Sequence, residues 1–204
     1  MKPLVYIVDD DAALRDGLSS LLRSADMDVA TFGSIAAFLA HCREERNSCL
    51  LLDVRLGGQS GMDLHAELNA QGCTLPVVFM TGFGDIPMSV RAMKAGAVDF
   101  LAKPVRVEEL LDAVGQALAR DAVCRAEQSL HADLRRRYDT LTPREREIMA
   151  LAARGLMNKQ IAGEVGTSEI TVKIHRGQAM KKMQARTFAD LVRMAELLSP
   201  YTHV

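Results

Sequence analysis

The sequence predicts an α/β domain followed by an all-α domain. In residues 1–120, five short apolar runs alternate with segments whose apolar residues recur at helical spacing. Such strand–helix units are typical of a doubly wound parallel sheet with helices on both faces. From Leu141 onward only short helical segments follow, and two of them are joined by a tight turn, as in a helix-turn-helix.

The runs Leu50–Leu52 and Val77–Phe79 are apolar without alternation, as in central parallel strands that are buried on both faces. We expect strands at Leu4–Val8, Val29–Phe32, Leu50–Val54, Leu75–Met80 and Val98–Ala102. The helices between them carry apolar residues at Leu14, Leu18, Leu21 and Leu22, at Ile35, Phe38 and Leu39, at Met62, Leu64 and Leu68, and at Met88, Val90 and Met93. The expected strand order is 2-1-3-4-5.

Polar residues follow four of these strands at their carboxyl ends, which meet at one edge of such a sheet. They are Asp9, Asp10 and Asp11 after the first strand, Asp53 at the third, Thr81 at the fourth and Lys103 after the fifth. Taken singly, acids before a helix serve as caps, and a lone lysine or threonine is commonplace. Their convergence on one edge indicates a functional site.

The grouped carboxylates favour a hard divalent cation, Mg²⁺ or Mn²⁺, bound through oxygen. Asp10 is the expected metal carboxylate, and Asp9 is expected to act through water. Because Asp53 stands alone at the end of the central strand, we expect it to be the nucleophile that accepts a phosphoryl group. Lys103 and Thr81 would then hold the phosphoryl oxygens.

The connector between the domains, residues 121–138, is expected to be helical. Helical periodicity begins at Val107, and neither Pro nor Gly interrupts Gln116–Thr140. We therefore expect a continuous extended helix between a first domain at 1–120 and a second at 139–204.

Capping residues define the helices of the second domain. Thr142–Glu145 has the pattern of a capping box with proline in the first turn, and this helix is expected to end at Gly155. A short helix is expected at Asn158–Val165. Ser168 then caps the second helix of the helix-turn-helix, Glu169–Met183.

This second helix is expected to present a basic, hydrogen-bonding face to the major groove of DNA. The residues that can face inward are Ile170, Ile174 and Met180, with Val172 in part. The residues expected to face outward are Thr171, Lys173, His175, Arg176, Gln178, Lys181 and Lys182. The candidate DNA-contacting residues are Ser168, Thr171, Lys173, Ile174, His175, Arg176 and Lys181.

The formal net charge of −1 conceals two parts of opposite sign. Residues 1–120 hold 11 basic and 16 acidic residues, a net charge of −5, whereas residues 121–204 hold 14 and 10, a net charge of +4. The positive part contains the expected DNA-binding helix. The four cysteines lack zinc-site spacing, and no apolar run approaches the roughly 20 residues of a membrane span. We expect a cytoplasmic protein with no membrane partner.

Four motifs at the strand ends are VDDD at Val8–Asp11, LLLDV at Leu50–Val54, MTG at Met80–Gly82 and AKP at Ala102–Pro104. They closely resemble the signature of the response-regulator receiver domain, over essentially residues 1–120. The resemblance implies a CheY-like fold and phosphorylation of Asp53 by a sensor histidine kinase. Leu56–Gln59 departs from the Met-Pro turn that the family usually has there, and predicts a more flexible loop.

The same resemblance implies roles for further residues. Mg²⁺ would be bound by Asp10, Asp53 and the backbone carbonyl of Arg55. Phosphorylation would draw Thr81 inward, and Phe100 would follow as the second switch residue. The Lys103–Pro104 bond would be cis. The face that changes and forms a homodimer would contain Val90, Arg91, Lys94, Ala95 and Asp99.

The stretch LTPREREIMALAARGLMNKQIAGEVGTSEITVKIHRGQAMKKM strongly resembles the LuxR/NarL-type four-helix DNA-binding domain. With the receiver, the chain resembles FixJ-type response regulators, and the motifs GFGDIPM from Gly82 and HRxxxM from His175 place it near StyR-like regulators of aromatic catabolism. The resemblance implies a fourth helix at Thr187–Leu198 that helps dimers form on promoter DNA, and RNA polymerase as a partner. Gly177 stands where some relatives have a larger residue.

The sequence thus predicts a two-component transcription factor that activates transcription, and not an enzyme beyond slow loss of its own phosphoryl group. Three alternatives stay open. They are an aspartyl-phosphate phosphatase, a phosphorylation-independent DNA-binding regulator whose receiver serves as a dimerisation module, and a phosphorelay intermediate.

Overall fold

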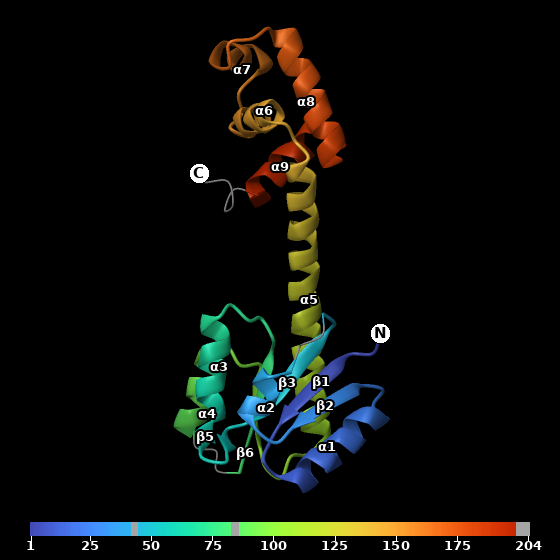
Figure 1. Ribbon diagram of the computed structural model, residues 1–204, viewed down its shortest axis with the longest axis vertical. Helices are drawn as coiled ribbons and strands as arrows, with labels where there is room; N and C mark the ends of the chain where they lie inside the picture. Colours follow the sequence, from blue (N-terminus) through green and yellow to red (C-terminus); the bar gives the residue numbers. More distant parts are fainter. Residues whose placement is uncertain (42–44, 83–85, 199–204) are drawn as a thin grey trace. The chain divides into compact units, whose positions relative to one another are not determined.

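The computed structural model of the chain describes residues 1–41, 45–82 and 86–198 (Figure 1). Two compact units result, Met1–Arg125 and Ala126–Val204, and both draw on helix α5 (Val107–Asp139). Residues 83–85 of the GFGDIPM motif and residues 199–204 of the second domain lie outside the described residues.

The first unit contains a five-stranded parallel sheet in the order β2-β1-β3-β6-β7. Its strands are β1 (Leu4–Val8), β2 (Asp28–Phe32), β3 (Ser48–Asp53), β6 (Val77–Thr81) and β7 (Asp99–Ala102). If these five strands are numbered 1 to 5 in chain order, the order in the sheet is the predicted 2-1-3-4-5. Every predicted strand is confirmed, with ends that shift by two residues or fewer.

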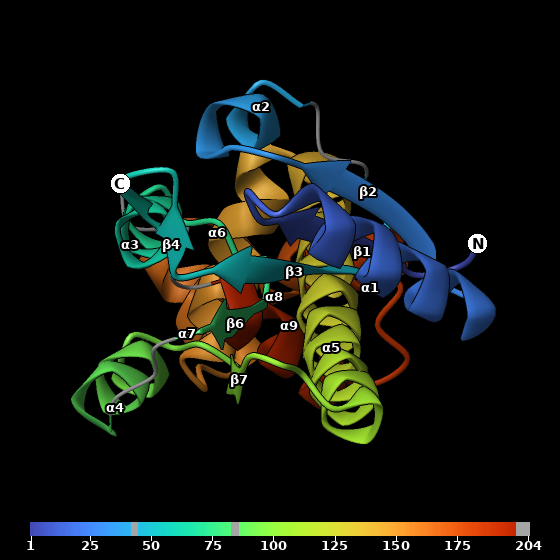
Figure 2. The same ribbon diagram turned by 90° about the horizontal axis from the view of Figure 1, so that it is seen from below.

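Helices cover both faces of this sheet (Figure 2). They are α1 (Ala12–Ser24), α2 (Ile35–Leu39), α3 (Gly61–Ala70), α4 (Ile86–Lys94) and the first part of α5. Successive strand residues point to opposite faces, so Tyr6 packs in a core cluster with Phe38 of α2, whereas Ile7 packs with Leu22 of α1 and Leu110 of α5. Strands β1, β3 and β6 are buried at every residue, which explains why their apolar residues follow one another without polar alternation.

A two-stranded hairpin that the sequence did not predict follows the central strand. β4 (Arg55–Leu56) pairs antiparallel with β5 (Gln59–Ser60). Gly57 and Gly58 form the turn with φ of 52° and 93°, two successive positive angles as in a type I′ turn. Where the sequence indicates a more flexible loop at Leu56–Gln59, the structure has a tight hairpin, and glycine supplies the backbone angles that its turn requires.

Some residues that carried the predicted helical pattern do not reach the core. The exposed fractions are 47% for Leu39, 45% for Val90 and 46% for Met93. On α4, Ala92 is fully buried instead. The helix therefore meets the sheet through a small residue and leaves larger apolar side chains at the surface.

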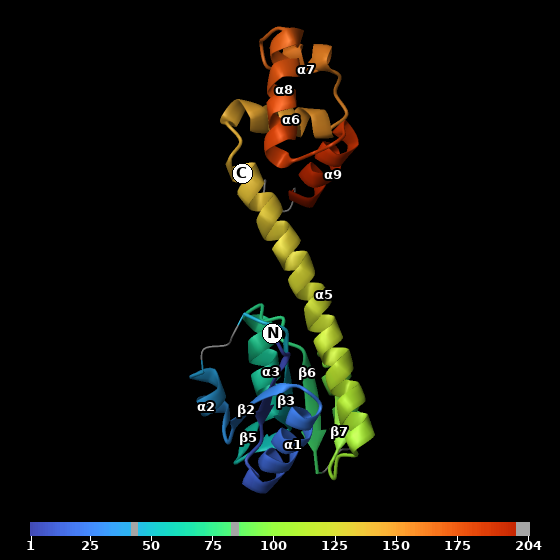
Figure 3. The same ribbon diagram turned by 90° about the vertical axis from the view of Figure 1, so that its right-hand side faces the viewer.

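Helix α5 runs without a break from Val107 to Asp139, so the predicted helical connector lies within it (Figure 3). Leu110 and Val114 belong to a core cluster of the first unit, and Leu134 belongs to one of the second. Among the described residues, no helix has both the length and the apolar character needed to cross a bilayer.

In its described part, to residue 198, the second unit adds four helices to the end of α5. They are α6 (Pro143–Ala153), α7 (Asn158–Glu164), α8 (Glu169–Met183) and α9 (Phe188–Leu198). The predicted capping box is confirmed, because Thr142 and Glu145 each accept from the other's backbone N–H. Ser168 likewise caps α8 by accepting from the N–H of Thr171. The predicted helix-turn-helix is thus formed by α7 and α8.

Candidate functional site

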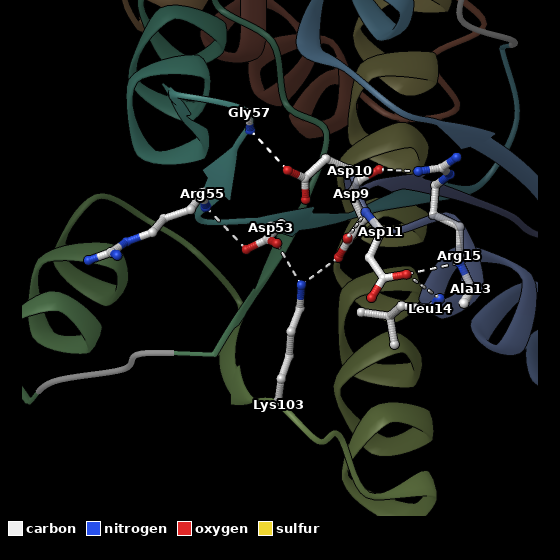
Figure 4. A network of polar contacts seen from close by, with 10 residues as sticks. All are labelled: Asp9, Asp10, Asp11, Ala13, Leu14, Arg15, Asp53, Arg55, Gly57 and Lys103. Carbon is white, nitrogen blue, oxygen red and sulfur yellow. Dashed lines mark hydrogen bonds and ion pairs between the residues drawn. The ribbon is translucent and has the colours of Figure 1, made fainter.

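Four strand ends bring the predicted residues of the first unit to one edge of the sheet. Figure 4 shows the aspartates and Lys103 at this edge. Asp9 and Asp10 follow β1, Asp53 ends β3, Thr81 ends β6 and Lys103 follows β7. One carboxylate oxygen from each of the three aspartates lies within 4.8 Å of the others. The parallel topology places them together although they are far apart in sequence.

Lys103 joins two of these carboxylates. Its Nζ lies 2.6 Å from Asp9 Oδ2 and 2.6 Å from Asp53 Oδ2. Asp9 is fully buried and Asp53 nearly so, and a buried carboxylate is tolerated only with such a partner. Burial alone would lower the pKa of Lys103, but hydrogen bonds to Asp53 and Asp9 outweigh it and raise the pKa above its ordinary value. The lysine therefore stays charged.

Backbone N–H groups orient the remaining carboxylate oxygens. The N–H of Arg55 donates to Asp53 Oδ1 at 3.1 Å, and the N–H of Gly57 donates to Asp10 Oδ2 at 3.1 Å. Asp10 is exposed, in contrast to the other two aspartates. The β4–β5 hairpin thus holds the acidic cluster from one side, a contact that no side-chain pattern could have predicted.

Two further residues beside the cluster have structural contacts. Asp11 caps α1, since its carboxylate accepts from the N–H groups of Ala13 and Leu14. Arg15 Nη1 donates to the backbone carbonyl of Asp9 at 2.6 Å. Arg15 could not be predicted from the sequence as a residue of this site, because its position in a helix does not indicate that its side chain contacts the end of β1.

The donor set fits a magnesium ion. Carboxylate oxygens are the ligands that Mg²⁺ prefers, and among these four side chains the three carboxylates outnumber the one ammonium. The cluster is therefore compatible with a Mg²⁺ site.

The candidate switch and dimer residues lie near this edge or on α4. Thr81 is buried, and its carbonyl accepts from the N–H of Lys103 at 2.7 Å. Phe100 is half-buried, with its ring centre 6.4 Å from that of Phe79. Of the candidate dimer residues, Asp99 is half-buried, and the exposed ones are Val90, Arg91, Lys94 and Ala95. The Lys103–Pro104 bond is cis.

In the second unit, helix α8 exposes a different face from the one predicted. The buried residues are Val172, Ala179 and Met183. The exposed face consists of Glu169, Ile170, Lys173, Ile174, Gly177, Gln178 and Lys181. The expectation that Ile170 and Ile174 face inward is wrong, because Val172 and Ala179, seven residues apart, occupy the packed side. Lys173, Ile174 and Lys181, three of the candidate contact residues, are accessible.

Several other candidates on α8 are engaged within the domain. Arg176 Nη1 donates to Asn158 Oδ1 at 2.9 Å, and its guanidinium lies 4.1 Å over the ring of Phe188. Lys182 Nζ donates to Glu145 Oε2 at 2.7 Å. The predicted outward placement of these two cations is therefore wrong, since both head groups hold neighbouring helices.

The other candidate contacts lie toward the N-terminus of α8 or at its side. Ser168 is exposed, and its hydroxyl lies 2.8 Å from that of Thr171. Thr171 and His175 are half-buried. Only part of the predicted set therefore shares one accessible surface.

Two family models match the chain: residues 5–115 match the response regulator receiver domain, and residues 139–195 match bacterial regulatory proteins of the luxR family. Nodulation protein W of Bradyrhizobium diazoefficiens is 52% identical over 197 residues, 97% of this chain and 87% of that protein. Response regulator protein TodT of Pseudomonas putida is 43% identical over 195 residues, 96% of this chain and 86% of that protein.

Solved structures show the same likeness. Response regulator StyR matches with 48% identity and a TM-score of 0.85, covering 96% of this chain and 99% of that one. Full-length FixJ from B. japonicum matches with 38% identity and a TM-score of 0.57, covering 97% of both chains. This chain therefore belongs to the family of two-component response regulators that join a receiver domain to a luxR-family helix-turn-helix DNA-binding domain.

Proposed function

We propose that a sensor histidine kinase phosphorylates Asp53, and that the phosphorylated protein dimerises, binds promoter DNA and activates transcription. The observation that carries the proposal is the Lys103 ammonium 2.6 Å from both Asp9 and Asp53 at the edge where the strands end. Phosphorylation would add negative charge at Asp53, and the neighbouring Lys103 ammonium is placed to stabilise that charge.

In the proposed transfer, an Asp53 carboxylate oxygen attacks the phosphorus of the kinase's phosphohistidine. The O–P bond forms as the P–N bond breaks, and the imidazole nitrogen keeps the electron pair and takes up a proton. Lys103 would neutralise charge on the transferred oxygens. The hydroxyl of Thr81, on the neighbouring strand end, would donate to another of them.

Mg²⁺, or Mn²⁺, would be held by Asp10, Asp53 and the backbone carbonyl of Arg55, with Asp9 acting through water. When bound, the ion would supply positive charge to the crowded carboxylates and to the phosphoryl oxygens. The exposed position of Asp10 supports this assignment, because its carboxylate can be reached from solvent.

Phosphorylation would then shift the equilibrium between two receiver conformations. Thr81 would move toward the phosphoryl group, Phe100 would follow, and the face of α4 and β7 would change. The residues proposed to form the homodimer there are Val90, Arg91, Lys94, Ala95 and Asp99. Val90 supports this surface, since it is an apolar side chain left 45% exposed on α4.

The exposed face of α8 would enter the major groove, with Lys173 and Lys181 supplying positive charge. The capped N-terminus at Ser168 suits a backbone phosphate. A dimer would place two such helices about one DNA turn apart on a dyad-symmetric site. Binding at promoters would bring the protein to RNA polymerase in the cytoplasm.

Phosphorylation is tested with a small acyl phosphate donor and Mg²⁺, followed by intact-mass measurement. We expect one phosphoryl group per chain that hydroxylamine removes, and none on Asp53→Asn. Asp63→Asn, which changes an exposed aspartate on α3, should be labelled like the wild type. Labelling that survives Asp53→Asn would refute the acceptor assignment, and multiple turnover of a phosphomonoester would favour a phosphatase.

DNA binding is tested by selection of bound fragments from random DNA, with and without the phosphodonor. We expect a dyad-symmetric sequence whose affinity rises on phosphorylation. Equal affinity in both conditions would favour a phosphorylation-independent regulator whose receiver only dimerises. No enrichment at all would refute the proposed DNA-binding role.

A further inference from the structure

Two isoleucines stand out on the exposed face of helix α8. Ile170 is 75% exposed, and apart from Met1 it is the most exposed large apolar side chain that the structure describes; Ile174 is 55% exposed. Burying such a side chain would stabilise the fold by about 1.5–3 kcal/mol, and isoleucine is not a strong helix former. Neither core packing nor helix formation therefore explains these residues.

The two side chains form one ridge on the helix. Residues four apart lie on the same face, about 6 Å apart along the axis. Gly177 continues this face one turn later, and a Cβ built there would meet nothing within 4 Å. Packing within the domain therefore does not require a glycine at residue 177. The missing side chain lets the backbone of α8 approach a ligand closely beside the ridge.

The surroundings of the ridge are hydrogen-bonding and carry a net positive charge. The exposed ionic side chains of α8 are Lys173, Lys181 and one acid, Glu169 in the first turn, and Gln178 is the exposed amide. An apolar protein surface that covered the two isoleucines would also cover the neighbouring lysines and remove water from their charged groups, which is unfavourable. DNA offers both features together, because phosphates line the major groove and thymine presents a methyl group within it.

We propose that Ile170 and Ile174 read the C5-methyl groups of thymines in the major groove. The inference rests on the proposed docking of α8 in that groove. A helix in the major groove runs obliquely to the DNA axis, and side chains three or four residues apart on such a helix can contact successive bases. The spacing of Ile170 and Ile174 therefore corresponds to about one base-pair step, and each half-site should contain two thymines on neighbouring base pairs.

The test uses the full-length phosphorylated protein and its selected DNA site, in which each half-site thymine is replaced in turn by deoxyuridine. This change removes the methyl group and keeps every base hydrogen bond. We expect Kd to rise about fourfold at each of two positions, as for one buried methyl group. Ile170→Ala and Ile174→Ala should each abolish the effect at one position.

Leu130→Ala is the matched control, since Leu130 is an exposed apolar residue of α5, at 53%. It should keep both the affinity and the sensitivity to deoxyuridine. The alanine variants of α8 should have an unfolding midpoint at least as high as that of the wild type, because both isoleucines are exposed and alanine is the stronger helix former. Full sensitivity in both alanine variants, or wild-type binding that ignores deoxyuridine at every position, would overturn the inference. A protein that selects no DNA would instead overturn the proposed function.

Discussion

The backbone of Gly61 lies so close to Asp53 that a Cβ atom on Gly61 would be 2.1 Å from the Asp53 carbonyl oxygen. Gly61 is buried at the start of α3, and its N–H donates to the carbonyl of Val54 at 2.9 Å. A side chain at residue 61 could be accommodated only if the end of β3 or the start of α3 shifted. That strand end positions the Asp53 carboxylate beside Lys103.

We expect Gly61→Ala to destabilise the receiver and to slow phosphorylation of Asp53. Overpacking typically costs about 1–3 kcal/mol, and here the obstacle is backbone that cannot rotate away. Urea unfolding and the rate of labelling by an acyl phosphate measure the two effects. Gly17→Ala in α1 is the control, because a Cβ there meets nothing within 4 Å, and it should stabilise by roughly 0.5–1 kcal/mol. Wild-type stability of Gly61→Ala would contradict the predicted close contact.

Removal of the Lys103 charge should make the receiver depend more strongly on Mg²⁺. Lys103→Met would leave Asp9 and Asp53 without their shared cation, and breaking a buried pair costs roughly 3–5 kcal/mol. We expect a lower unfolding midpoint without Mg²⁺, a larger rise when Mg²⁺ is added, and tighter Mg²⁺ binding than in the wild type.

Asp10→Asn should have the opposite effect and weaken Mg²⁺ binding, since it removes an exposed carboxylate of the cluster. Lys94→Met, at an exposed position of α4, controls for the loss of a lysine. An unchanged response to Mg²⁺ in Lys103→Met would show that the ion does not share this site.

The site edge could be predicted from sequence because parallel strands are short apolar runs whose ends are marked by polar residues. Asp53 and Lys103 were placed in this way. The hydrogen bond from the Gly57 N–H to Asp10 could not be predicted from the sequence, since the position of a backbone donor depends on the geometry of the turn. In α8 the hydrophobic pattern was misleading, because Ile170 is exposed while Arg176 is half-buried. Local rules are expected to fail where a surface serves binding.

Arg176 and Lys173 lie three residues apart on α8 and should fail in different ways. Arg176→Ala loses the hydrogen bond to Asn158 and the contact with the Phe188 ring. We expect a loss of about 1–3 kcal/mol in unfolding free energy. Lys173→Ala should leave stability unchanged, weaken DNA binding and lower the salt slope of binding by about 1.

Urea unfolding and DNA titrations over a range of salt concentrations separate the two effects. Each variant serves as the other's control. If Arg176→Ala unfolds like the wild type and weakens only DNA binding, then its guanidinium faces the ligand and not Asn158.

Glu145 is buried and links the capping box of α6 to Lys182 of α8. Burial alone would raise the pKa of this carboxyl. Hydrogen bonds from Lys182 and from Thr142 outweigh that effect and hold the pKa below its ordinary value of 4.5. Because the pKa is lower in the folded state than in the unfolded state, ionised Glu145 stabilises the folded domain above the unfolded pKa. This stabilisation is lost as the pH falls through the folded pKa.

Glu145→Gln should therefore lower the free energy of unfolding at neutral pH by about 1–3 kcal/mol, because the ion pair with Lys182 is lost and the hydrogen bond from the Thr142 N–H no longer goes to a charged group. It should also flatten the fall in stability that the wild type shows below about pH 4.5, since the glutamine cannot titrate. Urea unfolding of the full chain from about pH 6 down to about pH 3 measures both. Glu147→Gln is the control, since Glu147 pairs with Arg144 on the surface at 2.7 Å, where such pairs contribute little. A Glu145→Gln curve that falls in parallel with the wild type would show that other carboxyl groups govern the acid sensitivity of this domain.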